Sequence, residues 1–145
     1  MTINQTGNSN TSNVSVGANS ASDDNSIIQT ITGSSNTTTV NVGNNAATDD
    51  ADIDITATGD SNTITVNENS TATMGVGDKK VTNITAIGGS NTITSTHTGA
   101  ADQDTTLHHT GSSSTFSITQ GGAYDGAVDV TTVGSNHSVT ITMDD

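Results

Sequence analysis

Three groups of residues have types and spacings that could perform chemistry. Threonines alternate in a Thr-x-Thr pattern in similar segments, and on one flat face they would present hydroxyl and methyl groups at regular intervals: Thr37, Thr39, Thr63, Thr65, Thr92 and Thr94. Aspartate pairs, Asp23–Asp24 and Asp49–Asp50, would offer the oxygen ligands that Ca²⁺ prefers. A "GDSN" segment at 59–62 resembles a serine hydrolase signature.

The "GDSN" segment is one copy of a repeated turn. Related segments read "TGNSNTSNV" at 6–14, "TGSSNTTTV" at 32–40, "TGDSNTITV" at 58–66, "IGGSNTITS" at 87–95, "TGSSSTFSI" at 110–118 and "VGSNHSVTI" at 133–141. Asp60 therefore has no special position, and no Gly-x-Ser-x-Gly nucleophile elbow occurs. His97 and His109 are expected to point inward as filling for strand ends. We predict that the chain is not an enzyme.

Apolar residues alternate with polar ones on both sides of each turn, and a period of two predicts β-strands. Before the turns, the face expected to point inward carries Met1/Ile3/Gln5, Ile27/Gln29/Ile31, Ile53/Ile55/Ala57, Thr82/Ile84/Ala86, Thr105/Leu107/His109 and Val128/Val130/Thr132. After the turns it carries Ser12/Val14/Val16, Thr38/Val40/Val42, Ile64/Val66/Glu68, Ile93/Ser95/His97, Phe116/Ile118/Gln120 and Val139/Ile141/Met143. The last copy fits only after a shift of one residue.

One strand–turn–strand unit, called a rung here, cannot bury its apolar face alone, whereas stacked rungs can. The sequence therefore predicts an all-β fold, a β-solenoid of about six rungs of roughly 22–29 residues, as a single repeat domain over 1–145. The rungs are placed at roughly 1–25, 26–50, 51–80, 81–104, 105–126 and 127–145. A trimer of three intertwined chains is the alternative architecture.

Glycine and asparagine recur at the turns. Glycine supplies positive φ, and stacked asparagines would bond along the axis as an amide ladder. The expected turn and ladder residues are Gly7, Asn10, Gly33, Asn36, Gly59, Asn62, Gly88, Asn91, Gly111, Gly134 and Asn136.

Composition excludes several partners. The hydrophobic content of 28% and the net charge of −13 are typical of a disordered chain, and only the periodicity argues otherwise. With Lys79 and Lys80 as the only basic residues apart from histidine, we expect no nucleic-acid partner and no binding to anionic membranes. No apolar run reaches the ~20 residues of a membrane span. The segment "MTINQTGNSN" lacks the features of a signal peptide.

The runs "INQTGNSNTSNV" at 3–14 and "NSIIQTITGSSNT" at 25–37 resemble curlin repeats, which combine glutamine, glycine and asparagine at fixed offsets. Gln5, Gly7 and Asn10 match one unit, and Ser26, Gly33 and Asn36 match the next. The resemblance implies two strands per rung. Later rungs replace the first glutamine of the family by Ile31, Ala57, Ala86, His109 and Thr132, which weakens the implication of amyloid-like polymerisation.

Three functional classes remain open from the sequence. The first is a structural protein of a virion, such as a fibre or decoration subunit, or of an extracellular fibre, which forms a homo-oligomer or larger assembly through open β edges. The second is an ice-binding protein that uses the threonine columns. The alternative explanation is that threonine is simply a common residue on the solvated face of a strand. The third is an adhesin module stabilised by calcium at the aspartate pairs. The alternative is that these aspartates form a solvated, charged edge without metal. Lys79 and Lys80 would neutralise that edge without metal. No other cofactor is expected.

Overall fold

Two parallel β-sheets face each other in the computed structural model, which describes residues 1–17, 25–33, 35–43, 51–59, 61–69, 79–99, 102–122 and 126–144. Each sheet has six strands. One has the order β1-β3-β5-β7-β9-β11 and is called the first sheet here, and the other, the second sheet, has the order β12-β10-β8-β6-β4-β2. Among the described residues no helix is long and apolar enough to cross a membrane.

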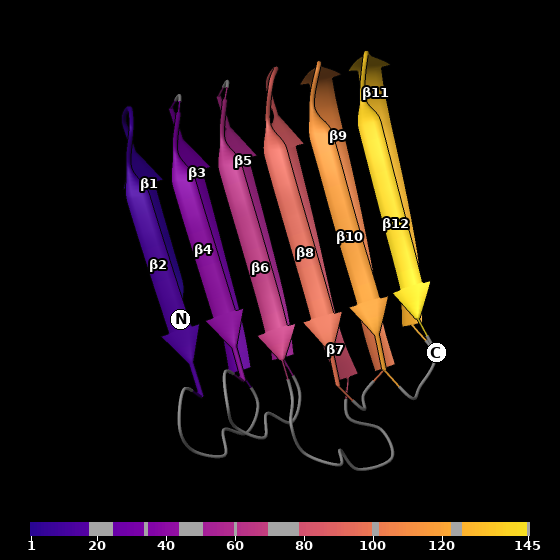
Figure 1. Cartoon of the computed structure of the whole chain (residues 1–145). Coiled ribbons are helices and arrows are strands. Elements are labelled where there is room, and N and C mark those ends of the chain that lie inside the picture. The colour runs from indigo at the N-terminus through magenta and orange to yellow at the C-terminus, as the bar shows by residue number, and fades with distance from the viewer. Residues whose placement is uncertain are drawn as a thin grey trace.

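The strands alternate between the two sheets along the chain. The first sheet contains β1 (Thr2–Thr6), β3 (Asn25–Thr32), β5 (Ala51–Thr58), β7 (Lys79–Ile87), β9 (Asp102–Ser112) and β11 (Gly126–Ser135). The second contains β2 (Thr11–Val16), β4 (Thr37–Val42), β6 (Thr63–Asn69), β8 (Thr92–Thr98), β10 (Thr115–Gly121) and β12 (Ser138–Asp144). In Figure 1 the strand pairs stand side by side from indigo to yellow, with the tight turns at one edge.

The strands of each sheet pair in parallel and in register with the repeats. Val40, for example, pairs with Val14 on one side and with Val66 on the other. The predicted β-solenoid is therefore confirmed. All of these pairs form within one chain, so the pairing does not require the intertwined trimer.

The core is a thin layer between the sheets, and the predicted alternation places it correctly. In the four middle rungs the apolar residues of the inward face are buried: Ile27, Ile31, Val40, Val42, Ile53, Ile55, Ala57, Ile64, Val66, Ile84, Ala86, Ile93, Leu107, Phe116 and Ile118. A parallel stack of rungs buries these side chains against the rungs above and below as well as against the opposite sheet.

The glycine that opens each turn has positive φ, and from the second rung on the preceding rung can also approach it closely. A Cβ atom on Gly33 would lie 1.6 Å from the Gly7 carbonyl oxygen, and one on Gly134 would lie 1.5 Å from that of Gly111. Their φ angles are 124° and 138°. Any side chain there would force the rungs apart, so the glycine column sets how tightly the turns stack.

Each turn also contains a residue other than glycine in the left-handed region. In the first five rungs it is Ser9, Ser35, Ser61, Ser90 and Ser113, with φ between 57° and 62°. In the last rung Asn136 takes this position with φ of 59°. A serine gives no sequence signal for this conformation, because glycine and asparagine adopt it at lower cost.

Candidate functional site

The expected threonine columns lie on the outer face of the second sheet. Thr37, Thr63 and Thr92 are in register and exposed. Thr39, Thr65 and Thr94 form the neighbouring column and are half-buried. The hydroxyl and methyl groups therefore repeat at the strand spacing of about 4.8 Å along the stack.

The asparagine ladder runs along the inside of the turns. The backbone N–H of Asn10 donates to Asn36 Oδ1 at 2.9 Å, and those of Asn36 and Asn62 donate to the next rung at 3.3 and 2.8 Å. The side-chain amide of Asn36 also donates to Asn62 Oδ1 at 3.3 Å. Each asparagine thus caps a backbone donor of the preceding rung, which ties the turns together along the axis.

The last two rungs depart from this ladder. Ser114 takes the ladder position in the fifth rung, where its Oγ accepts from the Asn91 backbone N–H at 3.1 Å. The expectation that Asn136 belongs to the ladder is wrong. Gly134 pairs with Gly111 and Ser138 with Thr115, so His137 occupies the ladder position. In the last copy the asparagine stands two positions after its glycine and not three, so Asn136 takes the left-handed position that serine takes in the other turns.

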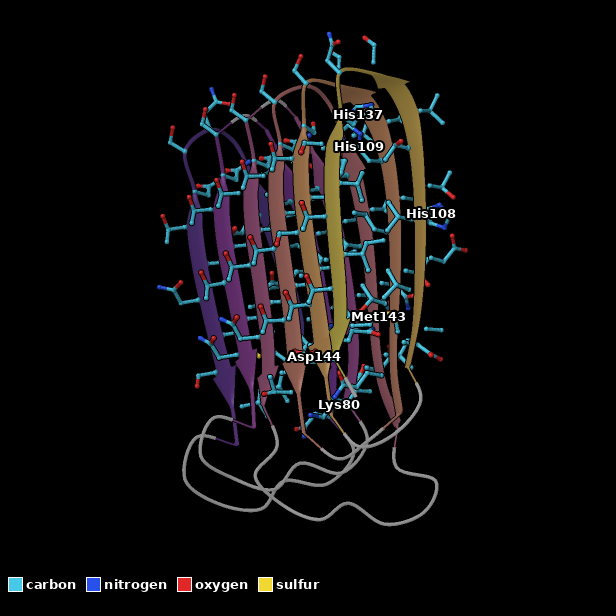
Figure 2. The ribbon with its side chains drawn as sticks, turned by 45° about the vertical axis from the view of Figure 1, so that its right-hand side comes forward. Lys80, His108, His109, His137, Met143 and Asp144 are labelled. Atoms are coloured by element: carbon cyan, nitrogen blue, oxygen red, sulfur yellow. The ribbon has the colours of Figure 1, made fainter. Side chains whose placement is uncertain are left out.

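Two histidines and a phenylalanine cluster at the turn end of the last two rungs (Figure 2). The ring centroids of His109 and His137 are 4.8 Å apart, and the Phe116 ring lies 5.0 and 5.9 Å from them. His109 Nε2 lies 3.0 Å from both the Gly88 carbonyl oxygen and Ser114 Oγ. Burial lowers the pKa of His109, the Gly88 carbonyl opposes this, and His137 adds to it.

The calcium prediction falls mainly outside the described residues, because Asp23, Asp24, Asp49 and Asp50 all lie there. Within the described ranges no group of three or more metal-ligating side chains occurs. Asp52 and Asp54 are the nearest described carboxylates, on the outer face of β5. Partial burial raises the pKa of Asp52, and the charges of Asp54 and Glu68 add to the effect. Calcium binding stays a prediction.

A buried polar network lies at the return-loop end of the core, opposite the turns. Glu68 and His97 are both fully buried, with 2.7 Å between Glu68 Oε2 and His97 Nδ1. Glu68 Oε1 accepts from Thr82 at 2.8 Å, and His97 Nε2 lies 2.8 Å from Ser95 Oγ and 3.1 Å from Thr105 Oγ1. The carboxylate and the imidazole are therefore in direct contact inside the core.

Lys80 lies inward near this network, and its predicted role in neutralising the aspartate edge stays a prediction. It is 0% exposed, and its Nζ lies 3.4 Å from the Thr98 carbonyl oxygen. Burial lowers the pKa of the Lys80 ammonium, and the Glu68 carboxylate partly counters this. The alternation that places Thr82 and Ile84 inward also places Lys80 inward, so the sequence pattern already indicated that Lys80 is buried.

Ser95, His97 and Glu68 stand in the order of a nucleophile, a base and an acid. All three residues are 0% exposed, so a substrate has no route to the Ser95 hydroxyl. Asp60 of the "GDSN" turn, the position considered in the sequence, lies outside the described residues.

A small hollow opens beside the last rung, where Gly126 provides no side chain. Its volume is about 20 Å³, and Gln103, Gln120, Met143 and Asp144 contribute to its lining. Gln120 Nε2 donates to Thr105 Oγ1 at 3.1 Å, whereas both amide atoms of Gln103 are buried without a hydrogen-bond partner. The volume and the polar lining suit one water molecule.

The two ends of the stack differ from its middle. On the last rung Val139, Ile141 and Met143 occupy inward-face positions but are 42%, 45% and 52% exposed. At the other end Met1 is 64% exposed, whereas Val14 is buried. Within the described residues no other element covers either end, so both leave parallel strand edges open, a feature that soluble β proteins usually avoid.

The fold and these features define a parallel β-solenoid with two strands per rung and two open ends. No family model, no curated protein and no solved structure matches the chain.

Proposed function

We propose that the chain is a non-enzymatic structural subunit that assembles through the open ends of its solenoid. The observation that carries this proposal is the exposure of Val139, Ile141 and Met143. Their columns are filled in the preceding rung by Phe116, Ile118 and Gln120, which are buried. The last rung thus has the composition of a core layer without the next layer to cover it, and a first rung of a second copy would provide that layer.

The register of the repeat defines how a second copy would dock. Continued across the joint, it places Val139 on Ser12, Ile141 on Val14 and Met143 on Val16 of the next copy. The joint then extends the core without a break, in a head-to-tail direction that leaves the same two ends open for further copies.

The hydrogen-bonding groups at the two ends are complementary in this arrangement. Inside the chain, each turn glycine donates to the next rung, as Gly7 does to the Thr32 carbonyl oxygen at 2.9 Å. Each strand after the turn donates back, as Thr37 does to the Asn10 carbonyl oxygen at 2.9 Å. The same rule would direct the Gly134 N–H to the Thr6 carbonyl of the next copy, and the Thr11 N–H to the preceding His137 carbonyl.

Charge does not oppose the joint, despite the net charge of −13. Residues 2–17 contain no charged side chain, and the described part of the last rung contains only Asp129 and Asp144. Since the N-terminal face has no charged side chain, the repulsion between copies comes from more distant carboxylates and is screened at physiological ionic strength.

The resemblance of the first two repeats to curlin repeats also supports an assembling subunit. We place the protein in a virion, as a fibre or decoration subunit, or in an extracellular fibre. Both settings use a rod that carries polar side chains on its outer faces and joins through its ends.

The variant Ile141→Asp tests the joint. We expect it to fold as the native chain does, because Ile141 is 45% exposed, and to remain monomeric, because stacking would bury the new carboxylate. Sedimentation velocity at several concentrations measures the oligomeric state, and circular dichroism measures the β-structure content. Thr140→Asp is the matched control, since Thr140 lies on the outer face of the same strand and should assemble normally. Equal assembly of the two variants would contradict an end-to-end joint.

Ice binding is the second candidate function, favoured by the registered Thr37/Thr63/Thr92 and Thr39/Thr65/Thr94 columns. We expect an ice-binding chain to show thermal hysteresis that Thr63→Glu reduces at least severalfold, because a carboxylate interrupts the ordered face. Thr56→Glu, on the outer face of the opposite sheet, should leave the hysteresis unchanged. Absence of hysteresis in the native chain would exclude this candidate.

A further inference from the structure

His137 occupies the ladder position of the last rung, which a head-to-tail joint would cover. In the chain, each ladder residue donates its backbone N–H to the side-chain oxygen of the next rung, as Asn10 does to Asn36. Continuation of this rule places the His137 N–H opposite Asn10 Oδ1 of the next copy. The His137 ring would then lie between its own fifth rung and the first turn of that copy.

The surroundings of this ring contain no partner for a positive charge. Both ring nitrogens of His137 are buried without a hydrogen-bond partner among the described residues. The titratable group that faces it is His109 on β9, with 4.8 Å between the ring centroids, and β10 contributes the uncharged Phe116. The facing turn of a docked copy, residues 5–11, contains no titratable side chain, so no carboxylate would compensate an imidazolium there.

We infer that His137 makes the head-to-tail joint sensitive to acid, so that copies stack when this ring is neutral and separate when it is protonated. At a free end, a protonated ring can turn toward water. In the joint the next copy blocks that movement, and burying an uncompensated charge is costly. Protons then bind more strongly to the separated chains, and by linkage acid favours separation.

The inference rests on the proposed assembly, and a comparison at pH 7.5 and pH 5.5 separates the two. Most carboxylates stay ionised across this range, whereas histidine changes its charge within it. The lower value, pH 5.5, is about one unit below the pKa of an ordinary histidine. If the joint accepts only the neutral ring, its association constant falls roughly tenfold at that pH.

We expect the association constant of the native chain, measured by sedimentation velocity, to fall about tenfold from pH 7.5 to pH 5.5. His137→Asn restores the residue of the earlier ladder positions, and this variant should assemble equally at both values. His108→Asn, which removes a histidine on the outer face (Figure 2), should keep the pH dependence of the native chain. Circular dichroism at both values confirms that the monomers stay folded.

Each other outcome overturns at least one of the two proposals. Assembly of the native chain to the same extent at both pH values, or the same pH dependence in His137→Asn, would refute the role of His137 while leaving the assembly intact. A native chain that stays monomeric at both values would refute the assembly and the role of His137 together.

Discussion

The variant Val40→Asp will fail to fold. Val40 is 0% exposed in the middle of β4, between Val14 and Val66 of the neighbouring rungs. An ionised carboxylate there would have no partner, and its burial costs on the order of 5 kcal/mol or more. Domains of this size are typically stable by about 5–15 kcal/mol. We expect loss of the β signal in circular dichroism, or a melting temperature at least about 15 °C lower.

Thr39→Asp is the matched control for the assignment of faces. Thr39 is the preceding residue of the same strand and points outward, so its carboxylate would remain hydrated. We expect a change in unfolding free energy within about 1 kcal/mol. If Thr39→Asp unfolded the chain and Val40→Asp did not, the inward and outward faces of the strand would be reversed.

The variant Glu68→Val will lose about 3–5 kcal/mol of unfolding free energy, because it leaves the buried Lys80 and His97 without the carboxylate. The substitution replaces the carboxylate by the residue that the same column contains at Val42. It therefore introduces a side chain that fits this position. The loss of unfolding free energy comes from Lys80 and His97, which remain buried without the carboxylate. Chemical denaturation at pH 7 measures the effect.

The triple variant Glu68→Val/His97→Val/Lys80→Ala removes the stranded groups as well. It reproduces the apolar composition of the second and third rungs, where Val42 stands in the column of Glu68 and His97, and Ala51 in that of Lys80. Replacement of a complete buried ionic group by packed apolar residues is often neutral or stabilising. We expect most of the lost stability to return. A triple variant less stable than Glu68→Val would show that the network contributes net stability.

The sequence predicts the fold well, because period-two alternation on both sides of a repeated turn leaves few other ways to bury the apolar residues. Ile53 and Ile55 before the turn, and Ile64 and Val66 after it, all lie where the alternation places them. The same alternation directs Thr39 and Thr65 outward. Stacking in register then follows, since only equivalent positions of successive rungs place apolar residues on one another.

The polar features of the core are harder to predict, because they depend on pairs of residues that come together only in the fold. Glu68 and His97 stand at inward positions in different rungs, and nothing local shows that their charges meet. The shift in the last rung is similarly hidden. "GSN" in 134–136 resembles the earlier turns, yet Asn136 stands two positions after Gly134 and not three, so His137 lies in the ladder in its place. Register across rungs, and not the local motif, decides these positions.

Electron cryomicroscopy of the purified chain at pH 7.5 and high concentration tests the central claim most directly. Head-to-tail stacking predicts rods whose strand spacing of about 4.8 Å continues across every joint, with a subunit repeat of about 29 Å along the axis for six strands in each sheet. Rods that grow by lateral contact of the outer faces, or single chains at every concentration, would contradict assembly through the open ends.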